Sequence, residues 1–371
     1  MPRFSTYIGL DVHKNSITLA FGPADLDEPV SKGEKLPNDL PRLLRRLKSF
    51  GEPSEVKLCY EAGPTGYGLV RELRALGYTC EVVAPAKTPQ VSRERVKTDK
   101  RDARRLAEYL RTGHLTEVRV PTEEEESLRD LVRAREDIKS VEVNMRRRLG
   151  GLMLRQGRIW RGTKHNWTKA HYEWLEVQEF ESRGTQEAKQ TYLEKIRSLQ
   201  VTLKDLDEAI EELVPSLKRA DLVRALCALK GVKTYTAAAL VSDIGDFKRF
   251  PSASKFMSFL GLTPSESSSG DTTRRGAITK AGNGRLRRLL VEAAWTYKKS
   301  PHIGRDLARR QRDASEVVRD HAWTAQKRLH KRKRVLDNAG KGSRKITVAL
   351  ARELAGFVWA IGQESDLMQA S

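Results

Sequence analysis

Two short apolar runs near the start of this chain each end in an acidic residue, and this pattern limits what the chain can fold into. The first run is Tyr7–Leu10, followed by Asp11, and the second is Val56–Tyr60, followed by Glu61. Runs of this length and content predict buried β-strands. Because an acid is costly at the end of a buried strand unless a positive group meets it, both carboxylates are candidate ligands of a cation.

The first 121 residues alternate between strand-like and helix-like segments. Four segments have the apolar content of strands, and the first two predict a hairpin: Tyr7–Val12, Ser16–Gly22, Val56–Glu61 and Cys80–Ala84. Three segments have the spacing of amphipathic helices: Leu40–Phe50, Gly66–Leu76 and Thr98–Thr112. A strand hairpin followed by alternating helices and strands predicts an α/β domain with a mixed sheet over residues 1–121.

Two further acids, Asp99 and Asp102, are three residues apart and therefore share one face of the third predicted helix. Taken singly, Asp99 could be a solvated acid or the N-cap of that helix, and Glu61 could cap the turn that follows it. As a set with Asp11, the four carboxylates predict a site for Mg²⁺, with Mn²⁺ as a substitute, because hard ions prefer oxygen ligands. Two such ions could stabilise the attacking and leaving oxygens of a displaced phosphate.

Residues 122–217 predict a helical arm. After Pro121 and four glutamates, a charged helix is expected to run to about Leu154, and a second one covers about Gln186–Leu213. Their apolar stripes predict an antiparallel coiled coil. Between them lie Trp160, Trp167 and Trp174, which predict a small separate core, with base stacking by exposed rings as the alternative.

Residues 218–371 predict an all-α domain. Leu222–Leu229 and Tyr235–Val241 flank a turn at Gly231 and resemble a helix-hairpin-helix, whose amides can touch a DNA backbone. A helix at Pro251–Leu260, a polar loop at Thr263–Asn283 and a terminal helix at Ile346–Ile361 are also expected.

The charge of the chain is concentrated near its C-terminus. Between Asp271 and Lys345 there are 22 Lys or Arg residues and 7 Asp or Glu residues, which accounts for +15 of the formal net charge of +20. A field of this strength favours a polyanionic partner, and nucleic acid is the first candidate. No apolar stretch is long enough to span a membrane, and the three scattered cysteines predict buried thiols in a reducing compartment.

A serine-rich segment, Gly261–Gly270, precedes six basic residues: Arg274, Arg275, Lys280, Arg285, Arg287 and Arg288. Its composition alone would suit a flexible linker. With the cations, a hydroxyl at a glycine turn could approach a phosphodiester while the basic groups bind its oxygens. Such a serine needs a base or a metal to become a nucleophile, and His13 and His302 are distant candidates for the base.

Several motifs together resemble the DEDD insertion-sequence transposases of the insertion-sequence one-hundred-and-ten family, the RNA-guided "bridge" recombinases. The resemblance extends in order over most of the chain and rests on these segments: Tyr7–Lys14, Tyr60–Gly66, Lys97–Ala103, Gly245–Phe250, Phe259–Pro264, Ser268–Gly270 and Gly276–Asn283.

This resemblance implies an RNase H-like (RuvC-like) domain, a coiled-coil arm and a C-terminal transposase domain. It implies that Asp11, Glu61, Asp99 and Asp102 are the DEDD metal ligands. It also implies that Ser269, with Ser268 as the alternative, becomes joined to a DNA 5′ phosphate.

The same resemblance implies the partners of the chain. They are donor and target DNA, a structured noncoding bridge RNA and further copies of the chain, as dimers that assemble into a tetramer in which the first domain of one subunit meets the last domain of another. The expected location is the bacterial cytoplasm, in association with the nucleoid. Two other functions remain open from the residues alone: a metal-dependent, structure-specific nuclease similar to a junction resolvase, and a non-catalytic basic RNA-binding protein.

Overall fold

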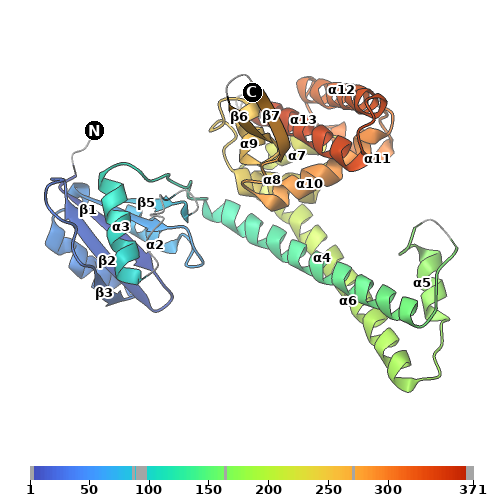
Figure 1. The fold of residues 1–371 in the computed structure, drawn as a ribbon, viewed down its shortest axis with the longest axis horizontal. Helices are drawn as coiled ribbons and strands as arrows, with labels where there is room; N and C mark the ends of the chain where they lie inside the picture. Colours follow the sequence, from blue (N-terminus) through green and yellow to red (C-terminus); the bar gives the residue numbers. More distant parts are fainter. Residues whose placement is uncertain (1–3, 86–87, 89–97, 163–164, 270–271, 365–371) are drawn as a thin grey trace. The chain divides into compact units, whose positions relative to one another are not determined.

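The computed structural model describes residues 4–85, 88, 98–162, 165–269 and 272–364 (Figure 1). The contacts divide the chain into two compact units, Met1–Thr122 and Glu123–Ser371. The second unit contains both the long helices of the predicted arm and the C-terminal helices. The division into residues 1–121, 122–217 and 218–371 stays a prediction.

The first unit contains a five-stranded mixed sheet in the order β3-β2-β1-β4-β5. Its strands are β1 (Thr6–Val12), β2 (Ser16–Pro23), β3 (Glu34–Pro37), β4 (Val56–Glu61) and β5 (Thr79–Val83). β2 is antiparallel to β1 and β3, whereas β1, β4 and β5 are parallel. The hairpin and the mixed sheet confirm the prediction of an α/β domain. The sequence did not predict β3, a short polar edge strand.

Helices cover both faces of this sheet. They are α1 (Leu40–Leu47), α2 (Gly68–Ala75) and α3 (Asp99–Arg111). Leu43 of α1 and Val70 of α2 pack with Ile8 and Leu10 in the larger core. The other face is closed by α3, which Figure 1 shows lying along the strands.

Two long helices, α4 (Glu123–Arg155) and α6 (Arg183–Leu213), pack against each other in the second unit. Four glutamates in the first turn of α4 complement the helix dipole. Both helices agree with the ranges expected for the arm, and their coiled-coil packing stays a prediction. At their far ends, with α5 (Lys169–Glu176), Leu149, Leu175 and Leu193 form a separate small core.

Of the three tryptophans between these helices, Trp167 and Trp174 pack against that small core, and Trp160 packs on Trp174. The Trp160 and Trp174 rings lie 5.6 Å apart, and His171 stacks on Trp174. All three rings are half-buried. The rings therefore pack within the protein, as the first of the two sequence interpretations expected.

The remaining elements form the helical body of the second unit. Its helices are α7 (Ala220–Cys227), α8 (Thr234–Ile244), α9 (Ala253–Phe259), α10 (Gly284–Ala294), α11 (Arg305–Gln311), α12 (Glu316–Asn338) and α13 (Ser343–Glu364). Their shared core includes Leu240, Phe256, Leu290 and Leu354. Cys59, Cys80 and Cys227 are free and buried, as expected. Among the described residues, no helix combines the length and the hydropathy that crossing a membrane requires.

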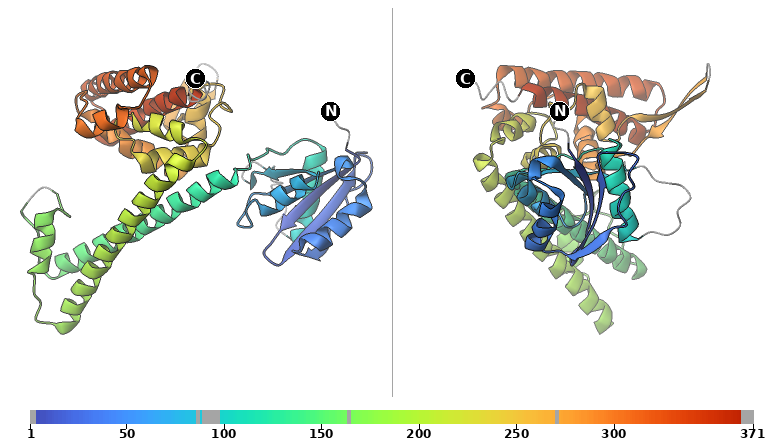
Figure 2. Two further views of the ribbon diagram at one scale, coloured as in Figure 1. Left: turned by 180° about the vertical axis from the view of Figure 1, so that it is seen from behind. Right: turned by 90° about the vertical axis from the view of Figure 1, so that its left-hand side faces the viewer.

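The segment expected as a polar loop at Thr263–Asn283 is instead mostly a strand hairpin. β6 (Pro264–Ser269) pairs antiparallel with β7 (Thr272–Ile278), and Figure 2 (right) shows the two strands extending away from the helices of their own unit. The loop prediction was wrong because serine and glycine content indicates little about strand pairing, which is set by the partner strand.

Candidate active site

The two strand-end acids follow neighbouring parallel strands on one face of the sheet. The register of β1 with β4 places Asp11 and Glu61 at corresponding positions, at the carboxyl ends of both strands. Gly9 on β1 and Cys59 on β4 contact α3. Because side chains alternate between the two faces of a strand, Asp11 and Glu61, two residues further on, are directed to the same face.

Gly9 allows α3 to approach this face closely. A Cβ atom at Gly9 would collide with the backbone of α3 at Ala103 and Ala107. The close approach brings the first turn of α3, with Asp99 and Asp102, next to the end of β1. Thr98 caps this turn by accepting a hydrogen bond from the Arg101 N–H, so the two acids have defined positions.

Asp11, His13 and Asp99 form a compact group of candidate ligands. One ligand atom from each lies within 4.8 Å of the others. His13 Nε2 is 3.1 Å from Asp11 Oδ2 and 3.8 Å from Asp99 Oδ1. From the opposite side, the Lys35 ammonium donates a hydrogen bond of 3.3 Å to Asp99 Oδ2.

The electrostatics of this group show a shortage of positive charge around Asp11. Burial raises the pKa of Asp11, His13 opposes that effect, and the charges of Asp99 and Asp102 raise the pKa further. By contrast, the hydrogen bond from Lys35 holds the pKa of Asp99 below its usual value. A cation between these carboxylates would favour the ionised form of Asp11.

The other two predicted acids lie beside this group. Asp102 is close enough to affect the pKa of Asp11, and it also forms an ion pair of 4.0 Å with Arg105. Glu61 is exposed at the end of β4 and, among the residues that the structure describes, is not part of the compact group of Asp11, His13 and Asp99. The structure thus brings Asp11, Asp99 and Asp102 together and leaves Glu61 on the adjacent strand.

These side chains fit a divalent cation. Carboxylates suit Mg²⁺ and Mn²⁺, and an imidazole beside them is a common ligand for transition metals. Lys35 is a member of this neighbourhood that the sequence did not reveal, because its position depends on the unexpected pairing of β3 with β2. His13 could be found from its spacing, two residues after Asp11.

The predicted nucleophile lies at the end of the β6–β7 hairpin. Ser269 is the last residue of β6, and the side chains of Ser268, Ser269 and Arg275 lie outside the described part of the chain. Arg274 on β7 is exposed.

The base of the hairpin is tightly packed. A Cβ atom at Gly282, whose φ is +86°, would collide with the Phe259 carbonyl. Lys280, exposed at this turn, itself has a positive φ of 55°. The strands therefore leave the body of the second unit from a fixed position.

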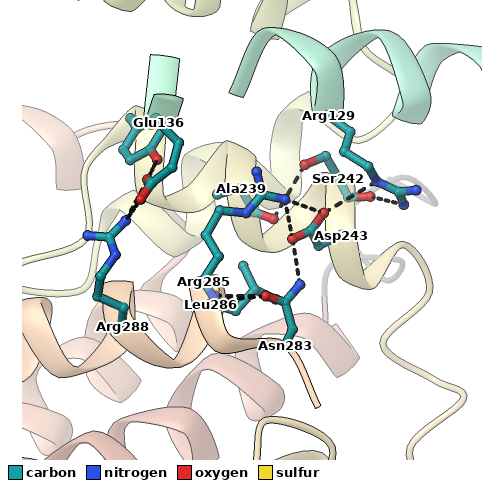
Figure 3. Close-up of polar contacts among 10 residues, drawn as sticks. Arg129, Glu136, Ala239, Ser242, Asp243, Asn283, Arg285, Leu286 and Arg288 are labelled. Carbon is teal, nitrogen blue, oxygen red and sulfur yellow. Dashed lines mark hydrogen bonds and ion pairs between the residues drawn. The ribbon is translucent and has the colours of Figure 1, made fainter. Parts of the chain in front are cut away.

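A buried charge cluster around Asp243 holds this position (Figure 3). Arg285 donates hydrogen bonds of 2.8 and 2.6 Å to the two carboxylate oxygens of Asp243. Arg129 of α4 forms an ion pair of 3.3 Å with the same carboxylate. Asn283 donates to Asp243 at 2.7 Å and also caps α10. The cluster thus joins α4, α8 and the start of α10.

Two other predicted phosphate-binding residues also have protein partners. Arg288 donates to both oxygens of Glu136, at 2.5 Å each, as Figure 3 shows, and Arg287 donates to the Leu260 carbonyl at 2.9 Å. With Arg285, these residues contribute to the packing of α10 in the structure. Arg274 and Lys280 are the described members of the predicted set that are exposed.

Comparisons with known proteins match both units. A model for DEDD transposases of the IS110 type, described as "Transposase", matches residues 8–156. A second model, described as "Transposase IS116/IS110/IS902 family", matches residues 223–308. The chain is 42% identical over 360 residues to "Putative transposase y4qE" of Sinorhizobium fredii, covering 97% of this chain and 89% of that protein. It is 32% identical over 337 residues to "Transposase for insertion sequence element IS1533" of Leptospira borgpetersenii, covering 89% of this chain and 96% of that protein.

Proposed function

Because this chain belongs to the IS116/IS110/IS902 family of transposases, we propose that it is an RNA-guided DNA recombinase that cuts and rejoins strands through a phosphoserine. The observation that carries the proposal is the acid group at the carboxyl end of β1 and the start of α3, inside the segment that the DEDD model matches.

In this proposal Asp11, Glu61, Asp99 and Asp102 hold Mg²⁺, or Mn²⁺ in its place. A divalent cation bound there would supply positive charge to the oxygens of the reacting phosphate. His13 orients Asp11 through its hydrogen bond. Lys35 donates a hydrogen bond to Asp99 and lowers the pKa of that carboxyl, and a metal ion would compete with this ion pair for the carboxylate.

Ser269 is the proposed nucleophile, with Ser268 as the alternative. Its Oγ forms a bond to phosphorus while the bond from phosphorus to the 3′ oxygen breaks, and the proton of the serine passes to a base. The 5′ phosphate stays on the serine, so the bond energy is conserved. A 3′ hydroxyl of the strand to be joined then attacks the phosphoserine, which restores a phosphodiester and the free serine.

Arg274, Arg275 and Lys280 are proposed to bind the phosphate oxygens near this serine, where developing negative charge is stabilised by cations. Arg285, Arg287 and Arg288 belong to the same proposed nucleic-acid surface. The partners of these three in the structure support a role in holding the hairpin and α10 in place.

The proposed partners are donor and target DNA, a structured bridge RNA and further copies of the chain, as dimers that assemble into a tetramer. The cluster of basic residues after Asp271 supports a polyanionic partner. The proposed place of action is the bacterial cytoplasm, on the DNA of the nucleoid.

The test is a search for covalent protein–DNA adducts. The purified protein is incubated with DNA carrying the element's ends, with Mg²⁺ and with RNA transcribed from the element's noncoding flank, and adducts are detected on denaturing gels. Wild-type protein and Ser268→Ala are expected to form adducts, and Ser269→Ala is expected to form none. Adducts with Ser269→Ala but not with Ser268→Ala would move the nucleophile by one residue.

Four outcomes would overturn all or part of the proposal. Cleaved DNA without any protein-linked product would favour a nuclease that uses water. Unchanged cleavage in Asp11→Asn, or binding of RNA without any cleavage under all conditions, would favour a protein in which the acid group has no catalytic role. Adduct formation without added RNA would exclude the RNA guide.

A further inference from the structure

The second unit contains a cavity that none of the predicted site residues occupies. It has a volume of about 850 Å³ and lies between α9, the base of the β6–β7 hairpin, α12 and α13. All of these elements belong to one compact unit, and Figure 1 shows α13 beside the hairpin. We call this cavity the α12–α13 groove.

The walls of the groove are largely apolar. Met257 and Leu262 contribute from α9 and the residues that follow it, Ile278 from the end of β7, and Val348 from α13. Covering apolar walls removes their surface from water, which is favourable when the ligand is also apolar. A ligand that fits this groove therefore needs apolar groups that can pack against the walls.

The rim of the groove is strongly basic. The lining includes five cationic side chains and one carboxylate, that of Glu353. Glu353 accepts contacts from two of the five, Arg328 at 3.0 Å and Arg332 at 3.3 Å. Arg344 and Lys345, in the first turn of α13, are exposed and have no carboxylate partner in the part of the chain that the structure describes.

An apolar interior with a basic rim fits an anion that carries flat apolar groups. Unpaired nucleotides have this chemistry, because their phosphates suit the rim and their bases can pack on apolar side chains. Duplex DNA does not fit as well, since its bases are stacked inside the helix and only their edges are exposed in the grooves. An acidic peptide would satisfy the rim and leave the walls without a matching group.

We propose that the α12–α13 groove binds unpaired nucleotides of a strand that passes the hairpin. The inference rests on the proposed function, and it adds a binding site on residues outside the acid group and outside the predicted phosphate contacts. Its site is separate from the catalytic groups, so the groove can be removed without removing the chemistry.

Strand β6 connects this groove to the proposed nucleophile, Ser269. Pro264 lines the groove and is the first residue of β6, whereas Ser269 is the last. At about 3.3 Å per residue the strand spans roughly 16 Å between them. This equals about five nucleotide steps at the duplex spacing of 3.4 Å. An unpaired strand can extend further per nucleotide, so the unpaired segment is expected no more than about five nucleotides from the reacting phosphate.

The experiment measures the binding of labelled oligonucleotides to the full-length protein by fluorescence anisotropy, over a range of salt concentrations. The probes are a single-stranded 12-mer, the duplex of the same sequence and an abasic strand of the same length. The test variant is Arg344→Glu with Lys345→Glu. The matched control, Arg183→Glu with Lys195→Glu, reverses two exposed cations on α6 and changes the net charge equally.

The test variant is expected to bind the single strand about tenfold more weakly, with the slope of log K against log salt reduced by roughly 1.4, which corresponds to two lost phosphate contacts. The control is expected to change affinity by less than about twofold. The natural strand is expected to bind wild-type protein more tightly than the abasic strand. Acidic residues in the first turn of a helix favour the helix, so a loss of fold would not explain the loss of binding, and circular dichroism checks this.

Three results would overturn the inference: equal losses in the test and control variants, equal affinities for the natural and abasic strands, or full competition by polyglutamate, which would identify an acidic peptide as the better ligand. The probes report noncovalent binding, whereas the adduct test reports covalent chemistry at the serine. Failure of the groove would therefore leave the adduct test unaffected, and failure of the adduct test would leave the groove intact.

Discussion

The acid group of the first unit and the arginines of the second unit are both clusters of like charge in the sequence, but they have opposite fates in the structure. The side chain of Asp99 is 43% exposed and that of Asp11 is 20% exposed. Arg285 is 15% exposed and its partner Asp243 only 6%. Asp11 and Asp99 lie at a surface beside the exposed side chains of His13 and Lys35, whereas Arg285 is paired with a largely buried carboxylate.

This difference shows how a cluster of like charge can be interpreted. Buried charges persist only when they have partners and hydrogen bonds, so a paired cluster is part of the fold. At the end of the sheet, burial and the charges of Asp99 and Asp102 raise the pKa of Asp11, while the side chains of Asp11 and Asp99 remain partly exposed and accessible to a cation. Position relative to the core therefore separates a binding site from a structural network better than composition does.

The largest expected effect tests the acid side of the comparison. Asp11→Asn removes the carboxylate at the centre of the group and is expected to lower transposition by about a thousandfold or more, because metal stabilisation of the phosphate is lost. The fold should be unaffected, since burial already disfavours the charge of Asp11. Element excision from a plasmid in cells measures the activity, and thermal unfolding measures the fold. Activity within tenfold of wild type would contradict the assignment.

The arginine side of the comparison predicts a loss of stability. Asp243→Asn leaves Arg129 and Arg285 with a neutral partner in a buried position, and the free energy of unfolding is expected to fall by about 3–5 kcal/mol. Denaturant unfolding followed by circular dichroism measures it. Arg288→Gln, at a more exposed ion pair, is the control and should cost about 1 kcal/mol or less. A larger loss of unfolding free energy in Arg288→Gln than in Asp243→Asn would contradict the expectation that the more buried ion pair contributes more to stability.

The small core at the far ends of α4 and α6, which we call the tip, contains a buried titratable group, His171, that is neutral when it accepts a hydrogen bond. His171 is 4% exposed, and its Nδ1 accepts a hydrogen bond of 2.9 Å from the Trp167 N–H. Burial lowers the pKa of His171. Its folded-state pKa is thus below the unfolded value of about 6.5, so the stability that it contributes is present above that pH and is lost as the pH falls through the folded-state pKa.

Acidification is therefore expected to weaken the tip by about 1 kcal/mol, the contribution of one hydrogen bond. Tryptophan fluorescence during unfolding at pH 7 and pH 5 measures this. His171→Gln should show less dependence on pH than wild type. Equal dependence in both proteins would mean that other groups cause it.

The smallest expected effect concerns the cation that already contacts the acid group. Lys35→Met removes the ion pair with Asp99 and with it a competitor for the metal. Since exposed pairs contribute about 0.2–1 kcal/mol, the Mn²⁺ concentration that gives half-maximal activity should fall by up to about fivefold. Lys14→Met is the control, because Lys14 is also exposed and follows His13 directly in the sequence. A higher requirement for Mn²⁺ in Lys35→Met would show that Lys35 helps to bind substrate instead.

Periodicity and apolar content were sufficient to predict four of the five strands of the sheet and its three α-helices. The bounds of β4 agree with the sequence prediction. Those of β1 differ by one residue at the N-terminal end, and those of α3 by one residue at each end. Local pattern failed where partners decide the structure. Glu34–Pro37 has no strand-like pattern and becomes β3 by pairing with β2, and β6 consists of a proline, a glutamate and serines that pair with β7.

Dependence on partners that are distant in the sequence also limited the prediction of the site. The acids could be found because strand ends and helix spacing are local properties of the sequence. The partners of Arg285 and Arg288 could not, because Asp243 and Glu136 lie 42 and 152 residues away along the chain. A cluster of cations in a sequence does not reveal which of them will be paired after folding.

The metal ion that an Asp11 variant requires for adduct formation tests the central claim most directly. Adduct formation is measured for wild-type protein and for Asp11→Cys, each with Mg²⁺, with Mn²⁺ and with EDTA. A thiolate is a softer ligand that binds Mg²⁺ poorly, so Asp11→Cys is expected to be inactive with Mg²⁺ and to recover part of its activity with Mn²⁺, while wild type is active with both ions. Wild-type activity in EDTA, or equal activity of Asp11→Cys with Mg²⁺ and with Mn²⁺, would contradict a metal ion bound by the acid group.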